Sequence, residues 1–227
     1  MHSGSQAFAI FDMDGLLIDS EPLWLATQKS QLLALYDLVV PEAELLAFQG
    51  TSTVQFCRTM AQRHHEHGVD ADVLLAAMLE RMAGLIAHAT LMPGAQALLQ
   101  RLAEAQVPMA IASSSPLHFI EAVVHAHALP VSVFASGLEV VRSKPHPAVF
   151  ELAAERLGSE VPAQCCVWED SVNGVIAARA AGMRVIAVPD PAHSNPAQFA
   201  IAHHIHSSLH DSLGADGHVA VLHDAII

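Results

Sequence analysis

Two carboxylates separated by one residue follow an apolar run near the start of the chain. Ala7 to Phe11 are all small or apolar, and Asp12, Asp14 and Gly15 come soon after them. A run of this kind, ending at a turn residue, is typical of a strand buried on both faces of a parallel sheet. Ligands bind at the carboxyl ends of such strands, so we expect both carboxylates at the mouth of a site.

These residue types suit the transfer of a phosphoryl group. A carboxylate such as Asp12 can attack phosphorus and form an aspartyl-phosphate, while Asp14 could protonate the leaving alkoxide and then deprotonate the attacking water. Further along the chain, the Ser113 hydroxyl and the Ser114 amide could hold phosphoryl oxygens. Lys144, one of two lysines, could supply fixed positive charge to the transition state.

A second acidic pair, Glu169 and Asp170, ends another apolar run. Magnesium prefers oxygen ligands, and it would lower the repulsion between an attacking carboxylate and a phosphate. The predicted magnesium ligands are Asp12, the backbone carbonyl of Asp14, Asp170 and Glu169.

Each of these groups also has an ordinary structural explanation. The serines could cap a helix starting at Pro116, Lys144 could be a solvated surface charge, and Glu169 with Asp170 could cap the following helix. The first acidic pair could likewise cap the next helix. Taken together, two acidic groups at the ends of strands favour a catalytic site.

The elements that must position these residues alternate between strands and helices, which predicts an α/β fold with a doubly wound, Rossmann-like parallel sheet. The predicted strands are Ala7 to Phe11, Val107 to Ala112, Val133 to Ser136, Cys165 to Trp168 and Arg184 to Val188, with a short one near Ala202 to Ser207. The predicted helices are Ala95 to Gln106, Pro116 to Ala128, Pro145 to Leu157 and Asn173 to Ala181.

One interval is too long for a single crossover. Asp12 and Ser113 are 101 residues apart, whereas the later strand ends are 24, 33 and 20 residues apart. The extra residues, roughly 70 beyond one crossover, contain helical patterns at 22–36, 52–67 and 70–88 and no convincing strand. We therefore predict a core domain of residues 1–19 and 91–227 and a helical cap domain of residues 20–90, which could close over the carboxylates.

Four motifs in this order resemble those of the haloacid dehalogenase-like phosphohydrolases. They are the DMDG sequence at Asp12, the SSSP sequence at Ser113, the SKPHP sequence containing Lys144, and the EDSVNG sequence at Glu169. The resemblance runs from about Phe8 to Pro189 and is greatest to the sugar-phosphate phosphatase branch with a helical cap. It implies a magnesium-dependent phosphomonoester hydrolase acting on small phosphorylated metabolites, hexose or hexitol phosphates, through an aspartyl-phosphate.

Three other functions could use similar residues. The β-phosphoglucomutase-like branch shares the motifs and the cap, but it has a histidine where this chain has Trp24, and an indole cannot accept a proton. A receiver-type signalling domain would lack the helical insertion and would be phosphorylated on a later strand. A dehalogenase of the same superfamily has no equivalent of Asp14 and no metal.

Substrate specificity is expected to come from the cap. Trp24 and the loop 48–53 could present an aromatic face and hydroxyl groups to a sugar. The full set of predicted substrate-binding residues is Ser113, Ser114, Lys144, Trp24, Gly50, Thr51, Ser52 and Asn173.

Composition limits the partners. The net charge is −13, which argues against nucleic acid or an anionic membrane as a partner, so a small phosphorylated molecule is expected. Three cysteines, two of them adjacent in an apolar run, indicate buried thiols in a reducing compartment. Neither a leader sequence nor an apolar span is evident, so a cytoplasmic location is predicted. The chain is also expected to be a monomer. His64, His65 and His67 lie close together, but no acid completes a metal site there.

Overall fold

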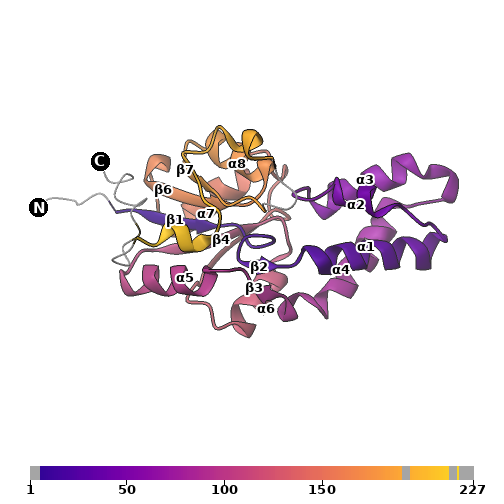
Figure 1. The fold of residues 1–227 in the computed structure, drawn as a ribbon. Helices are drawn as coiled ribbons and strands as arrows, with labels where there is room; N and C mark the ends of the chain where they lie inside the picture. Colours follow the sequence, from indigo (N-terminus) through magenta and orange to yellow (C-terminus); the bar gives the residue numbers. More distant parts are fainter. Residues whose placement is uncertain (1–5, 191–194, 215–218, 220–227) are drawn as a thin grey trace, which may run out of the picture.

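The central element of the computed structural model is a six-stranded parallel sheet, seen in Figure 1, within the described residues 6–190, 195–214 and 219. Its strand order is β5-β4-β1-β6-β7-β8, with β1 in the interior. This confirms the predicted doubly wound α/β fold. The strands are β1 (Phe8–Phe11), β4 (Met109–Ser113), β5 (Val133–Ser136), β6 (Cys165–Glu169), β7 (Arg184–Ala187) and β8 (His204–Ile205).

Helices cover both faces of the sheet because successive side chains of β1 point in opposite directions. Ala9 and Phe11 pack with α5 (Ala95–Glu104) and α6 (Leu117–Ala126). Phe8 and Ile10 pack on the other face with α7 (Ala148–Leu157) and α8 (Val172–Ala180). Figure 1 shows α5 and α6 below the sheet, with α8 above it. The predicted ends of these four helices differ from the observed ends by a few residues at most. For example, α7 starts at Ala148 instead of Pro145.

The long insertion forms a helical lobe beside the sheet in Figure 1. It contains α1 (Glu21–Tyr36), α2 (Glu42–Leu46), α3 (Thr53–Arg63) and α4 (Ala71–Ala83). The side chains of Leu74, Met78 and Met82 are buried in this lobe, as their helical spacing predicts. Short 3-10 helices are η1 (His65–His67), η2 (Ile86–His88), η3 (Pro162–Gln164), η4 (Pro196–Phe199) and η5 (Leu209–Ser212).

The expectation of no strand in the insertion region was wrong at both of its ends. β2 (Ile18–Asp19) and β3 (Thr90–Leu91) pair antiparallel, with Ile18 opposite Leu91. A two-residue strand is too short to show alternation in the sequence, and its pairing joins segments about 70 residues apart. This ribbon lies at both predicted domain boundaries, and the division into core and cap stays a prediction.

Several further local features can be compared with the sequence. Ser52 and Gln55 have the spacing of a capping box: the Ser52 hydroxyl accepts a hydrogen bond from the Gln55 amide (3.2 Å) and caps α3, while the Gln55 side chain donates to the Thr59 hydroxyl instead. The side chains of all three cysteines are buried, as the sequence predicts. None of the described helices combines the length and hydropathy that a membrane span requires. Most of the C-terminal segment that the sequence left unassigned, residues 215–218 and 220–227, lies outside the described residues.

Candidate active site

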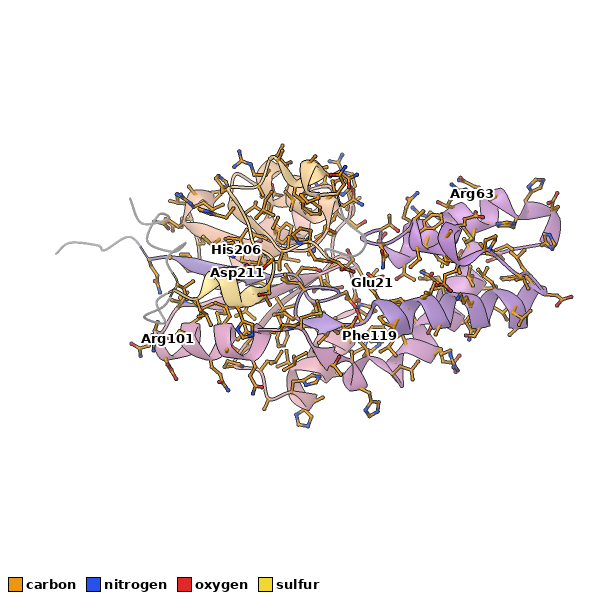
Figure 2. All side chains as sticks on the ribbon, viewed as in Figure 1. Glu21, Arg63, Arg101, Phe119, His206 and Asp211 are labelled. Atoms are coloured by element: carbon orange, nitrogen blue, oxygen red, sulfur yellow. The ribbon has the colours of Figure 1, made fainter. Side chains whose placement is uncertain are left out.

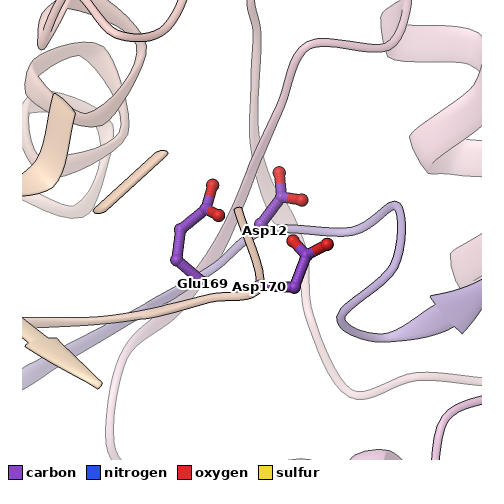
Figure 3. Close-up of side chains that lie close together, drawn as sticks. All are labelled: Asp12, Glu169 and Asp170. Carbon is purple, nitrogen blue, oxygen red and sulfur yellow. The ribbon is translucent and has the colours of Figure 1, made fainter. Parts of the chain in front are cut away.

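Three acidic side chains meet at the carboxyl ends of β1 and β6. Phe11 pairs with Trp168 in the sheet, so the residues that follow them, Asp12 and Glu169, are neighbours. Figure 3 shows the carboxylates of Asp12, Glu169 and Asp170 close together at this edge. Asp12 is 6% exposed and Glu169 is fully buried. Parallel pairing has therefore brought together motifs that are more than 150 residues apart in the sequence.

Lys144 is the cation of this site. Its Nζ donates hydrogen bonds to Asp12 Oδ1 (2.6 Å), Glu169 Oε1 (2.7 Å) and the Ala112 carbonyl (3.1 Å). Its side chain is 6% exposed. The loop between β5 and α7 carries it to the ends of the strands. Lys144 thus partly compensates a concentration of negative charge that would otherwise be buried.

Burial dominates the electrostatics of the acids. It raises the pKa of Asp12 to about 7, although Lys144 acts in the opposite direction, and Glu169 raises the pKa further. Burial also raises the pKa of Asp170 well above its usual value, with Glu169 and Asp12 contributing. Asp12 and Glu169 raise the pKa of Lys144 above its usual range despite burial. The single positive charge of Lys144 therefore does not balance the three carboxylates.

The acidic residues fit a divalent cation. One carboxylate oxygen from each of Asp12, Glu169 and Asp170 lies within 4.8 Å of the others. Asp170 Oδ1 is buried and has no hydrogen-bond partner in the structure. Gly15 leaves room for this carboxylate, because its φ is +80° and a Cβ there would lie 2.3 Å from Asp170 Oδ2. Oxygen ligands of this kind suit Mg²⁺.

Glu169 is held on both sides. Oε1 accepts from Lys144, while Oε2 accepts from the backbone amide (2.8 Å) and the hydroxyl (2.9 Å) of Ser171. Gly174 gives it space, since a Cβ at that position would lie 1.8 Å from Glu169 Oε1. The first turn of α8 and the glutamate therefore occupy adjacent volumes, and no side chain larger than glycine's fits between them.

The Asp14 carboxylate lies outside this group of three acids and accepts four hydrogen bonds. The Ser20 hydroxyl (2.7 Å) and the Trp24 indole N–H (3.1 Å) donate to Oδ1. The hydroxyls of Ser113 (3.1 Å) and Ser115 (2.8 Å) donate to Oδ2. Ser20 and Ser115 were missed by sequence reasoning, although Ser115 belongs to the quoted SSSP motif. The indole of Trp24, predicted to stack on a sugar, is directed to the carboxylate by this bond.

A cavity of about 80 Å³ lies between the sheet edge and the helical lobe. Ser52 and Asn173 do not line it: Ser52 caps α3, and the Asn173 side chain donates to the Gly50 carbonyl (3.0 Å). Their predicted contact with substrate stays a prediction. The predicted site residues that do line the cavity are Asp12, Asp14, Trp24, Gly50, Thr51, Ser113, Ser114, Lys144 and Asp170.

Glu21 also lines this cavity and was missed by sequence reasoning. Figure 2 shows it at the junction of the sheet and the helical lobe. Burial raises its pKa to about 7, and the nearby carboxylate of Asp14 adds to the shift. A sequence signal was absent because an acid in the first turn of a helix is common for reasons of the helix dipole alone.

Comparison with known proteins gives a consistent picture. A family model described as haloacid dehalogenase-like hydrolase matches residues 8–182. A Drosophila melanogaster protein named probable pseudouridine-5'-phosphatase is 36% identical over 80% of this chain and 81% of its own length. Hexitol phosphatase B of Escherichia coli K12 is 35% identical over 92% of this chain and 95% of its own length.

Solved structures share the whole fold. A mutant of CbbY from Rhodobacter sphaeroides, in complex with xylulose-(1,5)bisphosphate, has a TM-score of 0.81 and 26% identity, covering 93% of this chain and 99% of that one. A structure named β-phosphoglucomutase also shares the fold, at 17% identity, which shows the fold alone.

Proposed function

The chain belongs to the haloacid dehalogenase-like hydrolases, and from this membership and the geometry of the site we propose that it is a magnesium-dependent phosphomonoester hydrolase. The observation that carries the proposal is the position of Lys144, which bonds both Asp12 and Glu169. Asp170 Oδ1, buried beside them, has no partner. Such a site combines a nucleophile, a fixed cation and oxygen ligands for a metal.

Asp12 is the proposed nucleophile. Its carboxylate attacks phosphorus, the bond to the leaving oxygen breaks, and an aspartyl-phosphate forms. Lys144 offsets negative charge on the transferring group. The oxygens of that group are bound by the Ser114 amide and by the Ser113 hydroxyl, which turns its proton away from Asp14 when the phosphoryl group binds. Mg²⁺ held by Asp12, Asp170, Glu169 and the Asp14 carbonyl would lower the repulsion between nucleophile and phosphate.

Asp14 is the proposed acid and base. Its carboxyl group gives a proton to the leaving alkoxide, and the resulting carboxylate later takes a proton from the water that attacks the aspartyl-phosphate. Four neutral donors hold this carboxylate in the structure, so its orientation is fixed before substrate binds.

The proposed substrates are small phosphorylated metabolites, with hexose and hexitol phosphates first. The name of the E. coli relative, a hexitol phosphatase, supports this class. The Drosophila relative is named for a nucleoside phosphate, so the panel should be wider than sugars. A cytoplasmic location and a monomeric state remain predictions.

The test is release of inorganic phosphate from glucose 6-phosphate, 2-deoxyglucose 6-phosphate, sorbitol 6-phosphate and nucleoside monophosphates. We expect turnover with Mg²⁺ and none with excess EDTA. Asp12→Asn should keep the fold and lose activity on the order of a thousandfold or more, since an amide is a poor nucleophile. Turnover within tenfold of the parent protein would exclude Asp12 as the nucleophile.

A phosphoglucomutase-like activity is the alternative outcome. It would convert β-glucose 1-phosphate to glucose 6-phosphate without comparable release of phosphate. Trp24, which donates to Asp14 and cannot accept a proton, supports the hydrolase. Isomerisation in excess of hydrolysis would overturn the proposal.

A further inference from the structure

The helical lobe forms the wall of the cavity opposite Asp12, and no described lysine or arginine of the lobe lines this wall. All ten Lys and Arg residues of the sequence lie between Lys29 and Arg184, inside the range 6–190 that the structure describes. Of the residues that line the cavity, Lys144 is the only one of these types, and its ammonium group is already bonded to two carboxylates and a carbonyl. The helical lobe contributes amide, hydroxyl and apolar side chains to the wall, together with Glu21.

Two cations of the helical lobe, Arg63 and Lys29, form ion pairs outside the cavity. Arg63 stacks on the ring of Phe48, a cavity-lining residue, at 5.4 Å from its centroid, but its guanidinium is paired with Glu44 at 2.9 Å. Arg63 does not itself line the cavity, and Figure 2 shows it on the outer part of the lobe. Lys29 is paired with Glu42 on the surface.

Glu21 is the acidic group of this wall, and it adds negative charge where the pH exceeds its raised pKa of about 7. It is the first residue of α1, and the charged groups that act on it are the carboxylates of Asp14, Asp19 and Asp190. A carboxylate here can accept hydrogen bonds from hydroxyl groups of a bound molecule. It repels an anionic group, and the net charge of −13 acts in the same direction.

We infer that this wall restricts the enzyme to phosphomonoesters whose leaving group is uncharged and hydroxylated, and that it excludes bisphosphates and phosphorylated carboxylic acids. The inference rests on the proposed phosphatase function. The charge of the phosphoryl group would be offset at the sheet edge by Lys144 and by the Mg²⁺ that Asp12, Glu169 and Asp170 would hold. A second anion would lose its hydration against amides, apolar groups and Glu21 with no cation to replace the water.

The experiment compares two matched pairs of substrates. Sorbitol 6-phosphate and 6-phosphogluconate differ at the far end of the same six-carbon chain, a hydroxymethyl against a carboxylate. Glycerol 3-phosphate and 3-phosphoglycerate differ in the same way on three carbons. We expect the parent enzyme to favour the uncharged member of each pair by at least tenfold in kcat/KM.

Two variants test whether the cavity wall causes the preference. Gln28→Arg adds a cation on the wall, and Glu21→Gln removes the carboxylate. Each variant should lower the ratio of kcat/KM for the uncharged substrate to kcat/KM for the charged substrate at least threefold, mainly through a lower KM for the charged substrate. Gln62→Arg, an exposed residue of α3, and Glu151→Gln, an exposed first-turn acid of α7, make the same charge changes outside the cavity and should leave the ratio unchanged.

The outcomes separate the two proposals. Equal kcat/KM within both pairs, hydrolysis confined to the charged members, or hydrolysis of other phosphomonoesters only would overturn this inference while leaving a phosphatase. A ratio that neither cavity variant lowers, or that the outer variants lower equally, would also overturn it. Release of phosphate from none of these compounds, and none from p-nitrophenyl phosphate, would overturn the proposed function itself.

Discussion

Replacing Lys144 with methionine should destabilise the protein strongly, because it leaves buried carboxylates without their cation. The ammonium group makes charge-assisted hydrogen bonds of 2.6 and 2.7 Å to Asp12 and Glu169. Their side chains are 9% and 0% exposed, so water cannot replace it. Removing one partner from a buried ionic group costs about 3–5 kcal/mol, and we expect the Lys144→Met loss in this range.

The free energy of unfolding lost in Lys144→Met should increase with pH. The folded pKa of Asp12, about 7, is above its unfolded value, so this group lowers stability as pH rises from the unfolded pKa to the folded one. In the parent protein that loss ends near pH 7. Without Lys144 the folded pKa of Asp12 moves higher and the loss continues above pH 7, by about 1.4 kcal/mol for each pKa unit. The difference between variant and parent should therefore be larger at pH 8.5 than at pH 6.

The measurement is urea unfolding in EDTA at both pH values, with the free energy extrapolated to water. Lys29→Met is the matched control, because Lys29 is the only other lysine and forms an exposed pair with Glu42. Exposed pairs contribute about 0–1 kcal/mol, so the control should lose no more than that. A Lys144→Met loss no greater than the control at pH 8.5, or a loss independent of pH, would refute the account of the site.

Three further predictions concern the metal, the packing of the site and the orientation of Asp14. Asp170→Asn should raise the Mg²⁺ concentration needed for half-maximal activity at least tenfold, because the unpartnered buried carboxylate loses its charge. Gly174→Ala should destabilise by about 2 kcal/mol or more and reduce activity, since its Cβ would lie 1.8 Å from Glu169 Oε1. Trp24→Phe keeps an aromatic ring but removes the hydrogen bond to Asp14, so kcat should fall about tenfold with little change in KM.

A specific result would contradict each of these three predictions. An unchanged Mg²⁺ requirement would remove Asp170 from the ligand set. Gly84→Ala is the control for Gly174, because the nearest atom to its Cβ is a carbonyl oxygen at 3.8 Å and its backbone is right-handed, so stability should hold or rise. Equal effects of the two alanines would contradict the packing argument. A Trp24→Phe enzyme that lost only substrate affinity would favour stacking on substrate instead of support of Asp14.

The sequence determined the sheet and the places where its strands end. Continuous apolar runs followed by acids or serines predicted β1, β4, β6 and β7 to within two residues. Local propensity sufficed here because these strands are buried on both faces, and because Gly182, with a φ of +76°, marks the end of α8. The interval between Asp12 and Ser113 likewise predicted a helical insertion, since no single crossover needs that many residues.

Very short elements could not be predicted from the sequence. The β2–β3 ribbon has two residues in each strand, and its pairing depends on the two ends of the insertion returning to one place. The five-residue helix α2 was missed for a similar reason: it is too short to show a helical period. Both elements are stabilised by contacts with neighbouring segments, so their own residues do not predict them.

The tertiary structure alone decided which side chains contact one another at the site. Sequence placed Asp14 and Trp24 ten residues apart without indicating that the indole would donate to the carboxylate. It did not indicate that the Asn173 side chain would donate to the Gly50 carbonyl of the helical lobe. It did not mark Glu21 at all. Motif types and strand ends follow from local chemistry, but side-chain partners depend on distances between segments that meet only after the lobe and the sheet have packed together.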